Sequence, residues 1–336
     1  MYSLKIKDKS EVVIGKAEKL LPGLLPKGRV IVITDGNMDR LYGLQLADYE
    51  KIIIGTGETI KTLNTMEQIY TQLVEMGADR KTFLLGIGGG IVSDITGFVA
   101  ATYMRGVDFG FVSTTLLSQV DAGVGGKNGV NLGGYKNMVG TFNQPKFVIC
   151  DVDMLSSLSK REMRAGLAEV IKSAIIADAE LFAMLEGVSF EELIADNQKL
   201  SQIVISSVRV KADIVEKDER ESGERRKLNL GHTFAHAIEK GSSAMIHGEA
   251  VAVGTIIATN IALRMGLISK EDAARIVALH EKMGYDLQSP VPMVKMLKSI
   301  TKDKKAEQGY IYMVLPTAIG SCTVRKMSFD ELEETV

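Results

Sequence analysis

Short apolar runs alternate with helical patterns along the first half of the chain. The runs are rich in β-branched residues and end at glycine-containing turns, and residues 63–76 place apolar side chains at helical spacing. Strands that are apolar on both sides are typical of a parallel sheet covered by helices on both faces. The strands predicted in this way are 29–34, 51–54, 83–85, 108–112 and 147–150. We therefore predict an α/β domain whose ligands bind at the carboxyl ends of its strands.

The second half of the chain has a different pattern. Helical periodicity dominates from residue 160 onward, and the one strand pattern is 311–314. The helices predicted here are 161–185, 190–217, 230–240, 248–265 and 270–283. We place a boundary between an α/β domain, residues 1–159, and an all-α, or at least mainly helical, domain, residues 160–336.

Composition narrows the class of protein. The 336 residues are 46% hydrophobic and 24% charged, which excludes disordered, collagen-like and coiled-coil chains. The 40 basic and 42 acidic residues argue against a nucleic-acid partner. The two cysteines, Cys150 and Cys322, form no metal or disulfide motif, and the apolar stretch 251–267 is too interrupted by polar residues to span a membrane. With no signal-peptide pattern at the N-terminus, we expect a cytoplasmic protein.

A glycine cluster follows the predicted strand 83–85. Residues 86–94 read Gly-Ile-Gly-Gly-Gly-Ile-Val-Ser-Asp and open a helix, so their backbone N–H groups could approach a pyrophosphate. The cluster is not a complete GxGxxG motif, because Ile91 stands in it. By itself it therefore leaves a purely structural turn as an alternative.

Histidines give a sharper signal. Three of the four fall between residues 232 and 247, and His232 and His236 share one face of a predicted helix. His247 lies at the expected start of the next helix, and two histidines from adjacent helices, together with Glu169, a carboxylate in an otherwise apolar helical stretch, could hold a zinc ion with an open coordination position. Acid–base catalysis by the histidines without a metal is the alternative.

Basic and polar residues recur in glycine-rich surroundings, which indicates a pocket for a phosphorylated and carboxylated substrate. The charge-dense stretch 216–227 is either a solvated loop or a loop that folds over an anion. The residues of this kind are Arg105, Asp121, Lys127, Lys136, Asn137, Lys172, Lys211, Arg225, Asn229 and Lys304.

Taken together, these motifs resemble the 3-dehydroquinate synthase family. The matching runs are 88–94, 101–105, 121–137, 166–172, 228–236 and 247–252, in the family's order, and the resemblance extends from about residue 28 to 320. It implies a Rossmann-like NAD-binding domain followed by a helical metal- and substrate-binding domain. It also implies a carbon–oxygen lyase of the shikimate pathway, which converts 3-deoxy-D-arabino-heptulosonate 7-phosphate to 3-dehydroquinate and phosphate. The implied cofactors are NAD and zinc, or alternatively cobalt. The implied assembly is a homodimer.

The resemblance also assigns residues. Glu169, His232 and His247 resemble the metal ligands, and His236 resembles the histidine that transfers a proton. The set that contacts the substrate is Arg105, Asp121, Lys127, Asn137, Lys172, Lys211, Arg225, Asn229 and Lys304 or its neighbour Lys305. The set that contacts NAD is Asp35, Asn37, Glu58, Lys61, Gly89, Gly90, Asp94, Thr114, Thr115, Lys127 and Lys136.

The chain departs from the family pattern at three positions. Ser93 stands where the family usually has glycine, Asn128 where it has threonine, and Ala235 where it has glycine. The alternatives that remain are a related cyclase acting on sedoheptulose 7-phosphate or glucose 6-phosphate, an NAD-dependent polyol dehydrogenase, and a catalytically silent relative that only binds nucleotide.

Overall fold

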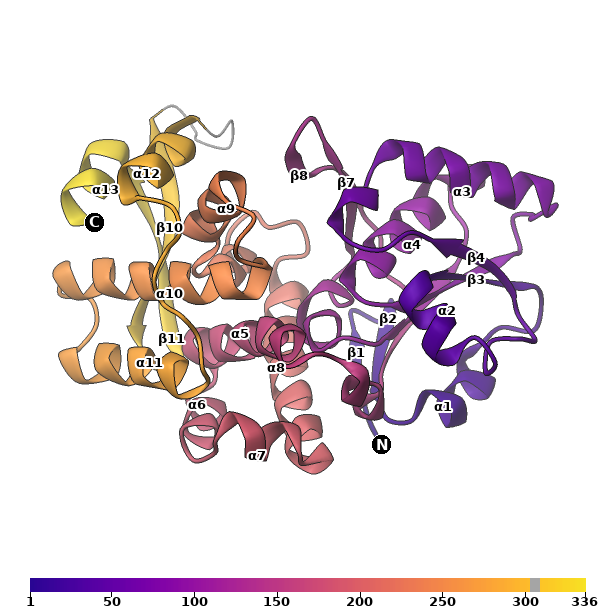
Figure 1. Cartoon of the computed structure of the whole chain (residues 1–336), viewed down its shortest axis with the longest axis horizontal. Coiled ribbons are helices and arrows are strands. Elements are labelled where there is room, and N and C mark those ends of the chain that lie inside the picture. The colour runs from indigo at the N-terminus through magenta and orange to yellow at the C-terminus, as the bar shows by residue number, and fades with distance from the viewer. Residues whose placement is uncertain (303–308) are drawn as a thin grey trace. The chain divides into compact units, whose positions relative to one another are not determined.

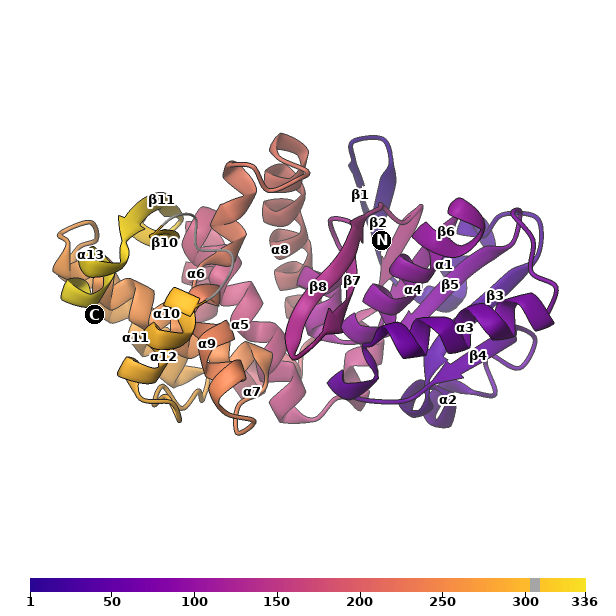
Figure 2. The ribbon, with the colours of Figure 1, turned by 90° about the horizontal axis from the view of Figure 1, so that it is seen from above.

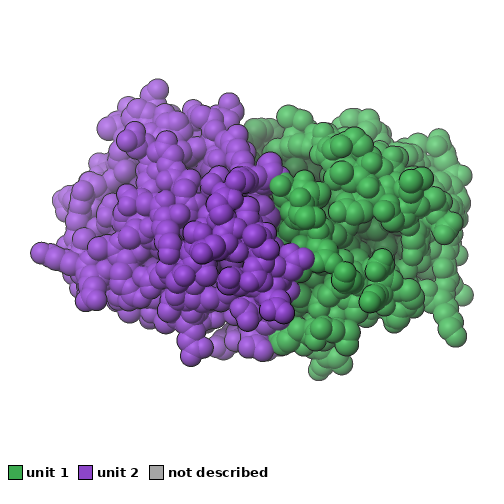
Figure 3. All heavy atoms as spheres, turned by 60° about the horizontal axis from the view of Figure 1, so that its bottom comes forward, with its two compact units in different colours: residues 1–158 green, residues 159–336 purple. Residues whose placement is uncertain are grey.

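The structure, a computed structural model, describes residues 1–302 and 309–336. The chain forms two compact units, residues 1–158 and 159–336, which Figure 3 colours separately. From the hydrophobic pattern, the boundary is expected one residue later. Among the residues described, no helix is long and apolar enough to cross a membrane.

Unit 1 is built on a seven-stranded sheet with the order β1-β2-β9-β6-β5-β3-β4 (Figure 1). All neighbours are parallel except β1 and β2, which form an antiparallel hairpin at one edge. The strands are β1 (Tyr2–Ile6), β2 (Ser10–Ile14), β3 (Val30–Asp35), β4 (Glu50–Ile54), β5 (Phe83–Gly88), β6 (Phe109–Ser113) and β9 (Phe147–Cys150). The five predicted strands are thus present. The N-terminal hairpin was not predicted, since charged residues interrupt its apolar pattern.

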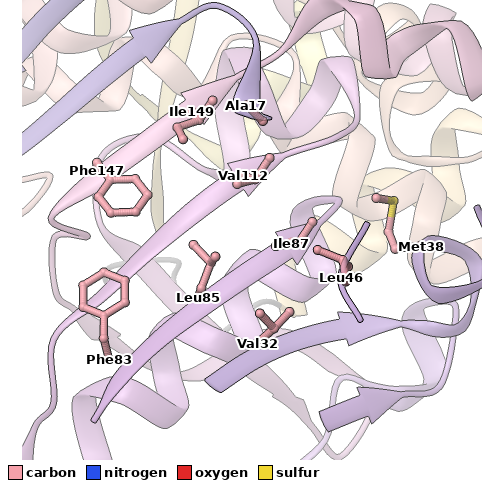
Figure 4. Close-up of a cluster of buried hydrophobic side chains, with 10 residues drawn as sticks. All are labelled: Ala17, Val32, Met38, Leu46, Phe83, Leu85, Ile87, Val112, Phe147 and Ile149. Atoms are coloured by element: carbon pink, nitrogen blue, oxygen red, sulfur yellow. The ribbon is translucent and has the colours of Figure 1, made fainter. Parts of the chain in front are cut away.

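Helices cover this sheet on both faces, as its doubly apolar strands require. Residues of α1 and α2 pack with alternate residues of β3, β5, β6 and β9 into the apolar cluster of Figure 4, where the rings of Phe83 and Phe147 stack at 5.7 Å between centroids. Helix α4 contacts β3, β5 and β6 from the other face, with α3 beside it. The helices are α1 (Ala17–Leu24), α2 (Gly36–Tyr42), α3 (Leu63–Glu75) and α4 (Gly90–Thr102).

Unit 1 also contains a second hairpin and several short turns. Strands β7 (Lys127–Leu132) and β8 (Tyr135–Phe142) pair with each other outside the main sheet. Their glycine and asparagine residues hide the strand period, so the hairpin was not predicted from the sequence. The short helical turns of the unit are η1 (Glu58–Ile60), η2 (Tyr103–Arg105) and η3 (Ser118–Ala122), and η4 (Val152–Ser157) precedes the boundary.

Unit 2 is mainly helical, as predicted. Helices α5 and α10 are buried over most of their length and pack against each other (Figures 1 and 2). The helices are α5 (Lys160–Ala177), α6 (Ala179–Glu186), α7 (Phe190–Ile194), α8 (Asn197–Lys217), α9 (His232–Gly241), α10 (His247–Arg264), α11 (Lys270–Lys282), α12 (Met293–Lys302) and α13 (Phe329–Thr335), with η5 (Glu224–Asn229) before α9. Of these, α12 and α13 were not predicted.

Aspartates divide two of the predicted helices. The prediction of continuous helices over 161–185 and 190–217 was wrong, because Asp178 and Asp196 leave the helical conformation and cap the helices that follow them. The Asp178 carboxylate accepts from the Leu181 N–H at 2.9 Å. An aspartate satisfies the free N–H groups of a helix start, which favours a new helix over a continued one. Similarly, the predicted strand 311–314 is one arm of a hairpin, β10 (Tyr310–Ala318) with β11 (Ser321–Ser328).

Candidate metal centre and nucleotide site

The candidate metal centre begins with a buried carboxylate. Glu169 lies in the middle of α5, and its side chain is 1% exposed. One turn further, the equally buried Lys172 forms an ion pair with it. Burying a charged group is costly unless the group pairs with an opposite charge or coordinates a metal ion. The fold therefore retains Glu169 for its interactions and not for packing.

Two histidines from other helices meet this carboxylate. His232 is the first residue of α9 and His247 the first of α10. Their Nε2 atoms lie 3.7 and 3.4 Å from Glu169 Oε1, and one ligand atom of each residue lies within 4.8 Å of the others. Bonds of about 2 Å to a tetrahedral zinc ion place ligand atoms about 3.3 Å apart. The three residues therefore have the spacing for one metal ion.

Hydrogen bonds at the opposite ring nitrogens orient both histidines. His232 Nδ1 lies 3.1 Å from the Leu230 carbonyl oxygen, and His247 Nδ1 lies 3.2 Å from Glu239 Oε1. In each ring, the hydrogen bond at Nδ1 turns Nε2 toward Glu169, where its lone pair is available to a metal ion once Nε2 carries no proton. Metal-binding histidines are held in this way by carbonyl and carboxylate groups. Two nitrogen donors and one oxygen donor fit zinc and leave room for a substrate ligand.

The charges around the two rings differ. Burial, together with the Lys172 ammonium, lowers the pKa of His232 to about 3, so this ring is neutral at physiological pH. Burial also disfavours a charged His247, but hydrogen bonds to Glu169 and Glu239 outweigh it and raise the pKa of His247 to about 10. A metal ion held by His247 would replace the proton that the two carboxylates stabilise there.

Removing the carboxylate behind His247 is expected to weaken metal binding. Glu239→Ala should lower zinc affinity about 10–100-fold, because outer partners of metal ligands have effects of this size. Glu239→Gln keeps an acceptor oxygen for Nδ1–H and should lose less. The measurement is competition for zinc with a chromophoric chelator. Glu191→Gln, which removes a surface carboxylate paired with Lys160, is the matched control, and equal affinities in all variants would contradict the role of Glu239.

Unit 2 also contains four further predicted residues, on α8, η5 and α9. His236 is one turn after His232 on α9, and the two rings lie 5.7 Å apart between centroids with nearly perpendicular planes. Lys211 on α8 and Arg225 in η5 are 7% and 1% exposed, which is unusual for cations. Asn229, the last residue of η5, donates to the Glu221 carboxylate.

The charge-dense stretch 216–227 folds around a carboxylate of the chain itself. Asp218 accepts from the N–H groups of Ser222, Gly223 and Arg225 at 2.9, 2.6 and 3.1 Å. Despite the opposing effect of burial, these bonds hold the pKa of Asp218 well below its usual range. These bonds order the loop around its own Asp218 and bear on neither alternative left by the sequence, so a loop that closes over an anionic ligand stays a prediction.

In unit 1, the residues predicted to contact NAD follow the carboxyl ends of neighbouring strands. Asp35 ends β3 and caps α2, on which Asn37 lies, and Glu58 is in η1 after β4. Gly89 and Gly90 join β5 to α4, and Thr114 and Thr115 follow β6. Because β6, β5, β3 and β4 are parallel neighbours, these ends meet at one edge of the sheet.

The glycine turn has the shape that a pyrophosphate requires. A Cβ atom at Gly90 would lie 2.9 Å from Ala122 Cβ, which requires a shift, and one at Gly89 would make a tight contact, 3.0 Å from Thr115 Cγ2. Gly89 caps the 13-residue helix α4, whose first N–H groups and dipole favour an anion. The residues present therefore fit the phosphates of a dinucleotide.

Two of the three departures from the family pattern make side-chain hydrogen bonds within unit 1. Ser93 is buried, and its hydroxyl lies 3.3 Å from the Gly89 carbonyl and 3.2 Å from the Ser118 hydroxyl, so it ties the glycine turn to η3. Asn128 donates from its amide to the carbonyls of Gly126 and Asn143. Ala235 is fully buried in α9.

Lys61 joins the residues predicted to contact NAD to one that is predicted to contact the substrate. Lys61 is 4% exposed and donates to Asp94 of α4 and to Asn137 Oδ1 of β8. The remaining predicted residues of unit 1 are placed on turns and on the β7–β8 hairpin: Arg105 in η2, Asp121 in η3, Lys127 in β7 and Lys136 in β8. Lys304 and its neighbour Lys305 lie outside the described residues.

Some residues of these sites were not found from the sequence. Glu239 lies seven residues after His232, and so on the same face of α9, but nothing in the pattern shows that it is buried beside His247. Asn131 contacts Glu58, which is distant in sequence. Asp218 contacts N–H groups that only the irregular loop after it brings together. The i, i+7 spacing from His232 is the one signal that could have pointed to Glu239.

Comparison with known proteins gives consistent results over most of the chain. The family model for the 3-dehydroquinate synthase N-terminal region matches residues 51–165, and that for the C-terminal region matches residues 166–306. A 3-dehydroquinate synthase of Saccharophagus degradans is 44% identical over 329 residues, which cover 95% of this chain and 90% of that protein.

Solved structures share the fold over both units. A 2-epi-5-epi-valiolone synthase of Streptomyces hygroscopicus, with NAD+ and Zn2+ bound, has a TM-score of 0.89 at 26% identity and covers 100% of this chain and 97% of its own. A 2-deoxy-scyllo-inosose synthase complexed with carbaglucose-6-phosphate, NAD+ and Co2+ also has a TM-score of 0.89, at 24% identity, covering 99% of this chain and 98% of its own. The second likeness bears on the fold alone.

Proposed function

The chain belongs to the 3-dehydroquinate synthase family, and we propose that Glu169, His232 and His247 hold the metal ion of its reaction while the glycine turn of unit 1 binds NAD. The reaction converts 3-deoxy-D-arabino-heptulosonate 7-phosphate to 3-dehydroquinate and phosphate, the second step of the shikimate pathway. NAD is regenerated in every turnover, so the enzyme is a carbon–oxygen lyase and not a net oxidoreductase.

The chemistry explains why two cofactors and several cations are needed. When bound, the metal ion acidifies the C5 hydroxyl of the substrate, and NAD takes up and returns a hydride at C5. A ketone at C5 makes the neighbouring C6 proton acidic, so phosphate leaves by elimination. Reduction of C5, ring opening and aldol closure then complete the product. The protein contributes by holding one substrate through all these steps.

The metal-centre geometry supports separate roles for the histidines. His232 and His247 direct Nε2 at Glu169, and both carry an oxygen partner at Nδ1. His236 lies one turn along α9 beside His232, where it can exchange a proton with a hydroxyl at the metal position. We assign it the proton transfer at the C5 hydroxyl.

Buried cations support an anionic substrate. Lys172, Lys211 and Arg225 are at most 7% exposed, and all three come from helices or turns of unit 2. Placing cations in such surroundings is costly, and a phosphate or carboxylate ligand offsets part of the cost. We assign them, with Asn229, to the anionic groups of the substrate. Arg105, Asp121, Lys127, Asn137 and Lys304 complete the set that the family resemblance implies.

The single observation that carries this function is the Glu169–His232–His247 cluster together with the buried cations of α5, α8 and η5 in the same unit. A polyol dehydrogenase acts on a neutral substrate and has no use for the cations. A cyclase for another sugar phosphate would use them, but the 3-dehydroquinate synthase of Saccharophagus degradans is 44% identical over 95% of this chain, against 26% for the valiolone synthase.

Phosphate release tests the function and the metal centre together. With NAD far below the substrate concentration, purified protein is expected to convert all the 3-deoxy-D-arabino-heptulosonate 7-phosphate without accumulating NADH. A chelator should stop the release, and added zinc or cobalt should restore it. Release from sedoheptulose 7-phosphate alone would overturn the substrate. NADH formed from a polyol, with no phosphate released from either sugar, would overturn the lyase assignment.

The assembly and location follow from the same family membership. We propose a homodimer that works in the cytoplasm, where sugar phosphates and NAD are available. Both cysteines are buried and free, which agrees with a reducing compartment. Light scattering of the purified protein at micromolar concentration tests the dimer, and a mass of one chain would contradict it.

A further inference from the structure

The hairpin β7–β8 is irregular at one position. Val130 pairs with Val139 and Leu132 with Tyr135, so residues 136–138 stand opposite the single residue Asn131. The backbone N–H of Asn131 donates instead to the Lys61 carbonyl at 2.8 Å, and Thr62 forms a parallel bridge with Asn131. The hairpin is thus joined at this point to the segment between η1 and α3.

The side chain of Asn131 uses both ends of its amide. Its Nδ2 donates to Glu58 Oε1 at 2.7 Å, and its Oδ1 accepts from the Asn137 N–H at 2.9 Å. Asn137 is in the left-handed region, with φ of 52°, and the bulge leaves its N–H without a strand partner. An amide is required here, because aspartate has no donor for Glu58 and an alkyl side chain has neither group.

Lys61 binds the side chain of Asn137, whose backbone is held by Asn131. Its ammonium donates to Asn137 Oδ1 at 2.5 Å and also to Asp94 at the start of α4. Asn137 is therefore fixed twice: Asn131 holds its backbone and Lys61 its side chain. Through these contacts, three residues of the proposed NAD set, Glu58, Lys61 and Asp94, are joined to one residue of the proposed substrate set.

We propose that Asn131 is a positioning residue that couples NAD binding to substrate binding through Glu58 and Asn137. The inference rests on the proposed function, which assigns Glu58 to the cofactor and Asn137 to the substrate. A cofactor that contacts Glu58 restrains the η1 segment, and Asn131 transmits that restraint to the left-handed backbone of Asn137. Substrate then binds a residue that is already ordered, and the coupling acts equally in both directions.

Two substitutions of Asn131 distinguish the hydrogen bond to Glu58 from the hydrogen bond to Asn137. Asn131→Ala removes both hydrogen bonds and is expected to raise KM for the substrate and Kd for NAD about three- to tenfold each, with a smaller change in kcat. Asn131→Asp keeps the acceptor for the Asn137 N–H but sets a carboxylate against Glu58. It should weaken NAD binding while leaving the substrate KM, measured at saturating NAD, near the wild-type value.

The decisive readout is the coupling itself. Kd for NAD is measured by calorimetry with and without a non-reacting substrate analogue, and the ratio of the two values should fall toward one in Asn131→Ala. Leu132→Ser, at the neighbouring half-exposed position of β7, is the matched control and should keep the wild-type ratio. Thermal unfolding of each variant shows whether the hairpin remains folded.

The outcomes distinguish this inference from the function on which it rests. If Asn137→Ala raises the substrate KM but Asn131→Ala changes neither KM nor the coupling ratio, Asn131 has no positioning role. If Asn137→Ala leaves the substrate KM unchanged, the assignment of Asn137 to the substrate is wrong.

Discussion

Replacing Glu169 by glutamine is expected to remove the metal ion and, with it, phosphate release. A zinc site with a full ligand set contributes about 10–16 kcal/mol, so one ligand accounts for roughly 3 kcal/mol, or more than a hundredfold in affinity. Glutamine also leaves Lys172, which is 2% exposed, beside a neutral group. Metal content after dialysis and the rate of phosphate release are the two measurements.

Loss of folding could imitate this result, and a second variant separates the two causes. Glu169→Asp keeps the charge near Lys172 but withdraws the carboxylate from the positions that lie 3.4 and 3.7 Å from the two histidines. This variant should keep the wild-type circular dichroism spectrum, which shows that it is folded, but its affinity for the metal ion should be lower than that of the wild type. Glu186→Gln, which removes a surface carboxylate paired with Arg275, serves as the control. Wild-type metal content in Glu169→Gln would refute the proposed site.

A methyl group at Gly248 is expected to damage both stability and metal binding. Gly248 follows His247 on α10 and lies against α5, where a Cβ atom would be 2.1 Å from the Ala165 carbonyl oxygen and 2.4 Å from Ala165 Cα. Neither backbone atom can move without separating the helices. Ala165 is one turn before Glu169, so separation draws His247 away from the carboxylate. We expect Gly248→Ala to cost about 3 kcal/mol in the free energy of unfolding.

Urea unfolding with and without zinc measures this effect. In the wild type, zinc should raise the unfolding midpoint because it binds only the folded protein, and in Gly248→Ala both the midpoint and the zinc effect should fall. Gly187→Ala is the control, since Gly187 has φ of −78° and a new Cβ would make only an ordinary contact, 3.4 Å from the Met184 carbonyl oxygen. Unchanged zinc stabilisation in Gly248→Ala would show that the close helix contact does not set the metal geometry.

The metal ligands illustrate how far sequence reasoning extends. The i, i+4 spacing predicts that His232 and His236 share a helix face, and both are on α9. Spacing alone gave them equivalent roles, and only the family resemblance separated them. In the structure, Glu169, His232 and His247 form one cluster. Nothing in residues 232–236 alone shows which of the two histidines belongs to it. The cluster depends on α5, α9 and α10 packing together.

Local patterns along the chain are enough to specify the kind of elements and the chemical groups that they carry. Doubly apolar strands ending in glycine turns specify a parallel sheet with anion-binding edges, and the run of helical periods after residue 160 specifies a helical unit. These properties are local, because a period of two or 3.6 is written in consecutive residues.

Which groups distant in sequence come into contact depends instead on how the elements pack. Glu239 reaches His247, Asn131 joins Glu58 to Asn137, and the Gly248–Ala165 contact brings His247 to Glu169. None of these contacts has a period or a fixed spacing. Each depends on the packing of whole elements and on irregularities such as the bulge at Asn131, where a hydrogen bond forms because the ladder has left a donor without its usual partner.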